Sequence, residues 1–318
     1  MRSRALTVSI AVLFFSGALC TGIIGCAQSD NEGGARKAGE KIRVTATVGM
    51  VGDLARNVGG EHVEVTTLMG PGVDPHLYKA SEGDIARLSG ADIVFYNGLL
   101  LEGKMADVLV KVARRGKPTV AVSETIDESR LREPPEFQGH YDPHIWFDVS
   151  LWAGTIPAVV AALSELDPAH AKDYEANGAA YARELAALHE EVRAAIATIP
   201  ADARVVVTAH DAFGYFGVAY DIEVIGLQGV STLAEYGIRD VQRIVDLITS
   251  RSVRAVFVES SVPRRSIEAV VAGCRAKGHE VKIGGELFSD AMGEEGTPEG
   301  TYIGMVRHNV NTIVESLR

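Results

Sequence analysis

One stretch of the chain restricts the possible folds more than any other. From Ala169 to about Ile199 the sequence contains no helix breaker except Gly178, and alanine is abundant. Such a segment predicts a single helix of about 30 residues, which is about 45 Å long at 1.5 Å per residue. A helix of that length is too long to connect two strands within one lobe. We therefore predict that residues 169–199 form a rigid helix that joins two lobes.

Strand-like and helix-like runs alternate on both sides of this segment. The first series starts with a strand-like run at residues 42–48, and a second series starts at residues 204–208. Alternation of this kind predicts a mainly parallel sheet with helices on its faces. We therefore predict an α/β protein with two lobes, residues 41–168 and 200–318, each with a mainly parallel sheet flanked by helices.

Local signals predict where several helices begin. Residues 148–165 are apolar with helical spacing, which predicts one helix. Asp167-Pro168 predicts the start of the long helix, with Asp167 as its N-cap. Ser81 predicts the N-cap of a short helix, and Asp84 three positions later suggests a capping box.

The N-terminus predicts a targeting segment rather than part of the fold. A basic start and a short apolar run lead to a small residue that stands just before Cys26. We interpret residues 1–25 as a lipoprotein signal peptide, Cys26 as the lipidated residue and residues 26–40 as a flexible tether. The protein would then be extracytoplasmic and lipid-anchored to the cell membrane, or periplasmic. An ordinary signal peptide and an uncleaved membrane anchor are the alternatives.

The charge of the chain argues against nucleic-acid binding, and its cysteine content argues against an intramolecular disulfide. The formal net charge of −11 argues against nucleic acid as a partner. Cys20 would leave with the signal peptide and Cys26 would carry lipid, so Cys274 would remain without a partner for a disulfide. Because Cys274 lies in an apolar helical pattern, we expect it to be an inert core residue.

Two loops of the same composition point to a single site. Asp74-Pro75-His76 and Asp142-Pro143-His144 are each followed by an aliphatic and then an aromatic residue. Proline stiffens its loop, so a histidine directly after it loses little entropy when it engages a ligand. Either copy alone could be an ordinary turn, because Asp-Pro commonly opens turns. Their repetition favours a metal site assembled from both loops.

The second lobe offers two more candidate ligands. His210 lies at the carboxyl end of a predicted strand and at the start of a predicted helix, and Asp290 lies just past another predicted strand. Ligands of such sheets bind beyond the carboxyl ends of the strands, so these residues would face the cleft between the lobes. With His76 and His144 they would give three imidazoles and one carboxylate, which suits Zn²⁺ and can also hold Mn²⁺. His210 could instead bond to backbone, and Asp290 could be a turn residue.

Two other residues could play lesser roles. Glu259, at the end of a predicted strand, could support the site from just outside the ligand set, although an ion pair with Arg239 or Arg264 is the simpler alternative. His140, in the charged loop before the second Asp-Pro-His, is expected to be solvated.

Taken together, the sequence from about Ile42 to the C-terminus resembles the metal-binding lipoprotein receptors of zinc and manganese ABC importers, the TroA-like and ZnuA-like class. The resemblance is carried by five pieces: Asp74-Pro75-His76, Asp142-Pro143-His144-Ile145-Trp146, the run from Thr208 to Phe216, Gly226-Leu227-Gln228-Gly229 and Leu287-Phe288-Ser289-Asp290. It implies two α/β lobes, a backbone helix and a four-ligand site at the cleft. By position, the implied ligands are His76, His144, His210 and Asp290.

The resemblance also bears on the metal and the partners. Histidine at position 210 is typical of zinc members and of mixed zinc and manganese members, whereas the short loop before His144 lacks the His-rich stretch of many zinc members. We expect zinc, with manganese close behind, one ion per chain, bound by a monomer that delivers it to an ABC permease and its ATPase. The alternatives are a metal-containing adhesin or structural lipoprotein and a metallohydrolase. Because metal-binding imidazoles must be neutral, affinity is expected to fall below a pH of about 6.5.

Overall fold

The computed structural model describes residues Gly39–Arg318. The predicted signal peptide (1–25), the predicted lipidation at Cys26 and most of the predicted tether (26–40) lie outside the described residues.

The first half of the described chain, residues 42–166, is built on a four-stranded parallel sheet. Its strands β1 to β4 lie in the order β2-β1-β3-β4, so β1 and β3 are the two inner strands. Apolar residues of the inner strands are fully buried, which is typical of a parallel sheet covered on both faces. The strands are Ile42–Ala46, Val63–Thr67, Ile93–Tyr96 and Thr119–Ala121, and the helices between them are α1 (Gly49–Gly59), α2 (Glu82–Gly90) and α3 (Ala106–Arg114).

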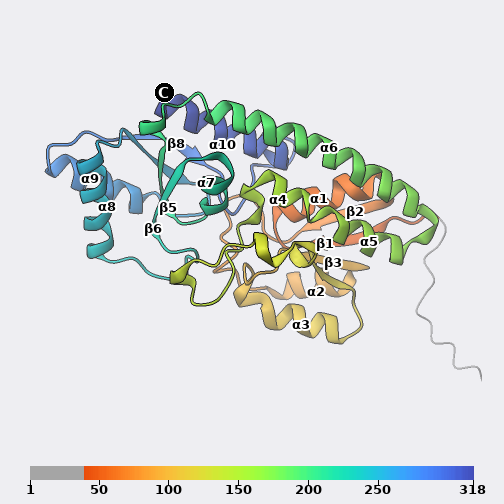
Figure 1. Ribbon diagram of the computed structural model, residues 1–318. Coiled ribbons are helices and arrows are strands. Elements are labelled where there is room, and N and C mark those ends of the chain that lie inside the picture. The colour runs from red at the N-terminus through yellow and green to blue at the C-terminus, as the bar shows by residue number, and fades with distance from the viewer. Residues whose placement is uncertain (1–38) are drawn as a thin grey trace, which may run out of the picture. The chain divides into compact units, whose positions relative to one another are not determined.

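The second half, residues 205–317, contains two parallel two-stranded ladders, β5-β6 and β7-β8, and β5 also lies against β7. Helices follow these strands as in the first half (Figure 1). The predicted α/β architecture is confirmed. The strands are Val205–His210, Glu223–Gln228, Ala255–Glu259 and Lys282–Leu287, and the helices are α7 (Gly214–Tyr220), α8 (Ile238–Arg251), α9 (Arg265–Ala276) and α10 (Tyr302–Leu317).

The long helix is α6, which runs over 26 residues from Ala171–Ile196. It packs on α1, α4 (Val149–Ala153) and α5 (Ile156–Leu166) from the first half and on α7 and α10 from the second (Figure 1). Gly178, which interrupts the alanine-rich sequence, lies against α5: a Cβ there would come within 2.8 Å of Val160. The helix therefore contacts both halves, as predicted.

Two local predictions are wrong. The stretch Val149–Leu166, which by length and composition could cross a membrane, forms two helices, α4 (Val149–Ala153) and α5 (Ile156–Leu166). The chain bends between them at Gly154, where a Cβ would lie 2.9 Å from the carbonyl oxygen of Leu151. Both helices pack on α6, so this apolar stretch contributes to the core.

The start of α6 also differs from the prediction. A 3₁₀ turn, Pro168–His170, precedes it. Asp167 stands at the N-cap position of this turn, but its side chain makes no capping hydrogen bond. The carboxylate of Asp167 instead accepts hydrogen bonds from Tyr174 and the His170 ring.

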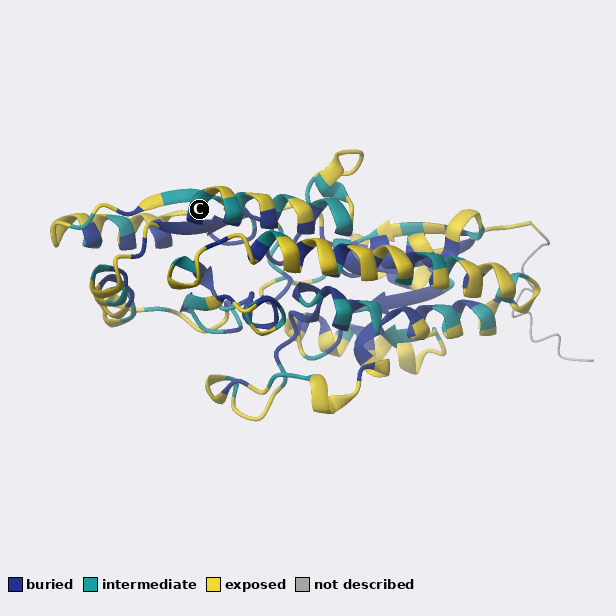
Figure 2. Cartoon of the chain, turned by 45° about the horizontal axis from the view of Figure 1, so that its top comes forward, coloured by how far each residue is buried: buried dark blue, intermediate teal, exposed yellow. Residues whose placement is uncertain are grey.

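The capping box predicted at Ser81 and Asp84 is confirmed. Figure 2 shows the buried strands lying between helices whose outer sides are exposed.

Candidate metal centre

The four predicted site residues come from four separate segments. His76 lies in the loop after β2, and His144 lies immediately before the 3₁₀ turn Ile145–Phe147. His210 is the last residue of β5, paired with Gln228 of β6, so it lies at the carboxyl end of a strand as predicted, whereas the next helix, α7, begins only at Gly214. Asp290 follows the end of β8. The two halves of the described chain therefore each supply two side chains.

These four side chains converge on one point. One ligand atom from each lies within 4.8 Å of the others. The Nε2 atom of His144 is 3.3 Å from Oδ1 of Asp290, and the Nε2 atom of His210 is 3.3 Å from Oδ2. The Nε2 atom of His76 is 3.7 Å from the same Oδ2. The Nε2 atoms of His76 and His144 are 3.3 Å apart. Donor atoms converge at this spacing around a single ion.

The burial of the cluster is as informative as its geometry. All four side chains are at most 1% exposed. His210 Nε2 and both carboxylate oxygens of Asp290 have no hydrogen-bond partner among the described residues. Polar atoms that are buried without partners are costly and call for an explanation. A cation held by all four side chains would satisfy these atoms together.

The Asp-Pro-His sequence has a structural cause in both copies. The Asp74 carboxylate accepts the backbone N–H of His76 at 2.8 Å, and the Asp142 carboxylate accepts that of His144 at 3.0 Å. Each aspartate thus folds its own loop back and holds the histidine two positions later. Proline between them fixes the intervening φ. Sequence reasoning noticed the aspartates only as turn residues and missed this role.

Carboxylates also hold the outer nitrogens of two histidines. Asp142 lies 2.8 Å from Nδ1 of His144, and Glu259 lies 2.5 Å from Nδ1 of His210. Glu259 also accepts the backbone N–H of His210 at 2.8 Å. Such partners fix the ring orientation and tautomer and leave Nε2 free for a metal. The alternative that Glu259 pairs with Arg264 does not hold, because Arg264 lies beside Glu268.

Arg132 is a further residue that the sequence did not single out. Its guanidinium lies 2.5 Å from the Asp142 carboxylate and against the ring of Tyr215. A Cβ at Gly214 would lie 1.5 Å from a guanidinium nitrogen, so only glycine leaves room for this arrangement. His140, by contrast, is exposed, as expected for a solvated residue, and its ring meets that of Phe137 edge to face.

The three imidazoles of the cluster differ in the direction in which their pKa values are shifted. Burial lowers the pKa of His76 to about 3. Burial would also lower the pKa of His144, but its bond to Asp142 and the adjacent Asp290 raise this pKa to about 9. Burial would lower the pKa of His210 as well. The negative charges of Glu259 and Asp290 outweigh it and raise this pKa well above its usual value. Against the opposing effect of burial, the charge of His210 and the proximity of His144 hold the pKa of Asp290 well below its usual range.

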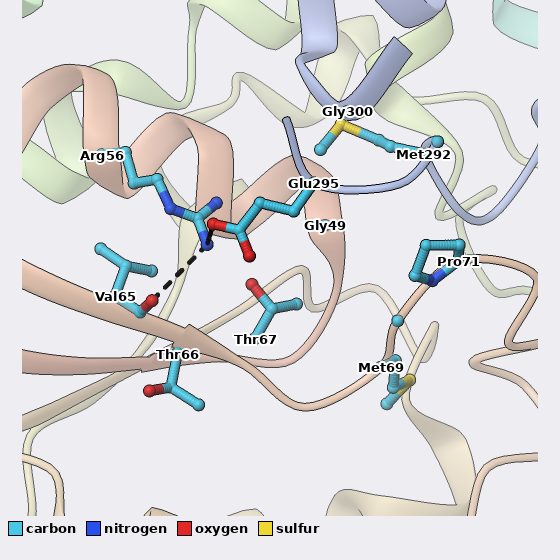
Figure 3. Close-up of a pocket in the computed structure, with 12 residues that line it drawn as sticks. Gly49, Arg56, Val65, Thr66, Thr67, Met69, Pro71, Met292, Glu295 and Gly300 are labelled. Atoms are coloured by element: carbon cyan, nitrogen blue, oxygen red, sulfur yellow. Dashed lines mark hydrogen bonds and ion pairs between the residues drawn. The ribbon is translucent and has the colours of Figure 1, made fainter. Parts of the chain in front are cut away.

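The cluster is distinct from the cavities of the surface. Figure 3 shows a cavity of about 340 Å³ between α1, the end of β2 and the segment around Met292. Its charged lining groups are Arg56 and Glu295, which lie 4.0 Å apart. None of the four converging side chains lines it. The converging cluster is closed and small, which suits one ion and not an organic ligand.

The two α/β halves and the buried cluster of three histidines and one aspartate together define the class of the protein: a binding protein with one candidate site for a metal ion. A family model described as the periplasmic component A of a zinc-uptake complex matches residues 44–316. The chain belongs to this family. It is therefore a binding protein and not an enzyme, which removes the metallohydrolase alternative.

Several relatives are similar over nearly their whole length. The manganese-binding lipoprotein MntA of Bacillus subtilis is 51% identical over 308 residues, covering 97% of this chain and 98% of the relative. The metal ABC transporter substrate-binding lipoprotein FimA of Streptococcus parasanguinis is 31% identical over 314 residues, covering 97% and 98%. A solved structure of the periplasmic zinc-binding protein TroA from Treponema pallidum superposes with a TM-score of 0.84 at 48% identity, covering 87% of this chain and 99% of that one.

Proposed function

We propose that this chain is the extracytoplasmic receptor of an ABC importer. It captures one divalent transition metal ion per chain with His76, His144, His210 and Asp290, and it delivers the ion to a permease that works with an ATPase. The observation that carries this proposal is the convergence of four buried ligand groups whose carboxylate oxygens lack other partners. Neutral imidazoles and a carboxylate are the donor set that suits such ions.

The relatives support the location and the task. FimA is named a substrate-binding lipoprotein of a metal ABC transporter, and MntA is also named a lipoprotein. These names, and the N-terminal sequence of this chain with Cys26, support a protein that is extracytoplasmic and membrane-anchored. We propose that it works as a monomer. A lipid anchor keeps the receptor near its permease.

Zinc is the proposed cargo, with manganese as the second candidate. Three imidazole nitrogens and one carboxylate bind Zn²⁺ more tightly than Mn²⁺ at the same site. The relatives' names do not separate the two, because MntA is named for manganese and TroA for zinc.

A metal-containing adhesin or structural lipoprotein is the second candidate, since a buried metal could serve stability alone. Reversible loading and co-purification with a permease separate the two. A receptor loses its metal to a chelator, remains folded, rebinds metal and is recovered with the permease from membranes. A metal that cannot be removed without unfolding, and no association with a permease, would favour the structural protein.

Glu259→Gln tests how the site holds His210. Glu259 accepts two hydrogen bonds from His210, and glutamine offers only one acceptor oxygen. Zinc affinity is expected to fall by about 10–100-fold, as is usual when an outer partner of a ligating histidine is lost. The control is Glu268→Gln, which alters a surface carboxylate beside Arg264. Equal affinities of both variants and the wild type would contradict the role of Glu259.

The pH dependence of binding follows from the raised pKa values. His144, with a pKa of about 9, and His210 hold protons at pH 7 in the metal-free site, whereas His76 does not. A metal must displace these protons, so affinity falls as pH drops below about 9, a higher limit than the ordinary histidine pKa suggests. Binding at pH 7 is expected to release about two protons, which calorimetry in buffers of different ionisation enthalpy measures. Affinity that is constant between pH 9 and 7 would contradict this.

A further inference from the structure

The two Asp-Pro-His loops are held very differently by the second half of the chain. Tyr215 donates to the carbonyl of Asp142 at 3.0 Å and accepts the backbone N–H of Arg132. Two residues past His144, the ring N–H of Trp146 donates to the carbonyl of Ser289 at 3.1 Å. The loop of His144 is therefore tied to the second half by several buried hydrogen bonds.

The loop of His76 has a single tie of this kind. One carboxylate oxygen of Asp74 accepts the backbone N–H of His76, and the other accepts the hydroxyl of Thr232 at 2.6 Å. Within the described part of the chain, this is the one hydrogen bond that joins residues 70–78 to the second half. The same carboxylate thus holds the His76 turn on one side and the second half on the other.

Thr232 is itself held in place from the metal centre. The side-chain amide of Gln228 donates to the carbonyls of Thr232 and Ala234 at 3.3 and 2.8 Å. Gln228 is the register partner of His210 where β5 and β6 end. A continuous series of contacts therefore leads from His210 through Gln228, Thr232 and Asp74 to His76. It gives the Gly226-Leu227-Gln228-Gly229 segment a structural role.

Space beside this contact allows it to open. A cavity of about 340 Å³ is lined by Asp74, Leu77, Gln228, Thr232 and Tyr236, among others. If the hydroxyl of Thr232 left Asp74, no other hydrogen bond from the second half would keep the His76 turn closed, and the turn would have room to move. The loop of His144 leads into buried aromatic residues instead, since the ring of Phe147 packs on that of Phe213 with the ring centroids 4.1 Å apart.

We propose that Thr232, held by Gln228, is a positioning residue for His76: its hydroxyl locks the first Asp-Pro-His turn through Asp74 and sets the rate at which the metal leaves. This inference rests on the proposed metal-binding function. The bond to Asp74 holds the turn in the position described, so its loss speeds release and leaves capture nearly unchanged. His76 is then the first ligand to detach.

The test compares Thr232→Val, which removes only the hydroxyl, with Thr232→Ser, which keeps it. Full-length protein is loaded with Zn²⁺ and mixed with an excess of a chromogenic chelator in a stopped-flow instrument. Release from Thr232→Val is expected to be about tenfold faster than from the wild type, because a hydrogen bond to a charged group is lost. Thr232→Ser should restore a slow rate. The matched control is Thr249→Val, since the hydroxyl of Thr249 bonds only within α8.

Further measurements separate positioning from a general loss of structure. Metal-free Thr232→Val should keep the fold of the wild type, with the same far-UV circular dichroism spectrum, and its capture rate should be nearly that of the wild type. In an Asp74→Ala background, Thr232→Val should add nothing, since the two residues act through one contact. Equal release rates of wild type and Thr232→Val would overturn the inference while leaving the proposed function intact. A wild type that binds neither zinc nor manganese would instead refute the function itself.

Discussion

Replacing Asp290 by asparagine is expected to weaken zinc binding by more than about 100-fold, because even the loss of an outer partner of a ligand costs about 10–100-fold. Asp290 is the one anionic member of the four-ligand cluster, and its oxygens lie 3.3 Å from Nε2 of both His144 and His210. Asparagine preserves the shape but removes the charge. Competition against a chromogenic chelator at a fixed pH measures the change in affinity.

The control for this variant is Asp92→Asn, which alters a carboxylate that pairs with Arg43 at the surface. It should bind zinc as the wild type does. If Asp290→Asn also bound zinc with wild-type affinity, Asp290 would not be a ligand, and the four-residue site would be wrong.

Removing the metal is expected to lower the melting temperature by about 10 °C relative to protein with zinc at about a thousand times its dissociation constant. Such an excess stabilises the folded state by about 4 kcal/mol, and each kcal/mol shifts the melting temperature by about 2–4 °C in chains near this size. Scanning calorimetry with and without chelator measures the shift.

Two controls give this shift its meaning. Mg²⁺, which prefers oxygen ligands and retains its water, should produce little shift at the same concentration. Asp290→Asn should lose most of the zinc-dependent shift. A wild type that melts at the same temperature with and without zinc would show that the folded chain holds no zinc at the buried cluster.

Much of the site could be predicted from the sequence because each element carries a local signal. The two histidines follow Asp-Pro, and His210 and Asp290 stand at or just past the ends of strands, so general rules for loops and sheets led to all four residues. The long helix was predictable for a similar reason. Its alanine-rich sequence lacks breakers, and the one glycine fits a close contact with α5.

Other features depend on contacts between distant segments and left no local signal. The break between α4 and α5 was missed because the apolar spacing continues through Gly154. Thr232 gains its role only when the two halves meet across 158 residues of sequence. Burial would lower the pKa of His144, but the carboxylates of Asp142 and Asp290, brought beside it by the fold, raise this pKa, which the ordinary value for histidine cannot anticipate.

The central claim is that the buried cluster is a reversible site for one transition metal ion. The most direct test is a calorimetric titration of the chain from Ala27 onward with Zn²⁺ and, separately, Mn²⁺, after a chelator has removed bound metal. We predict one ion per chain for each metal, tighter binding of zinc, and much weaker binding of both by His210→Ala. Absence of stoichiometric binding of either metal by the folded wild type would contradict the claim.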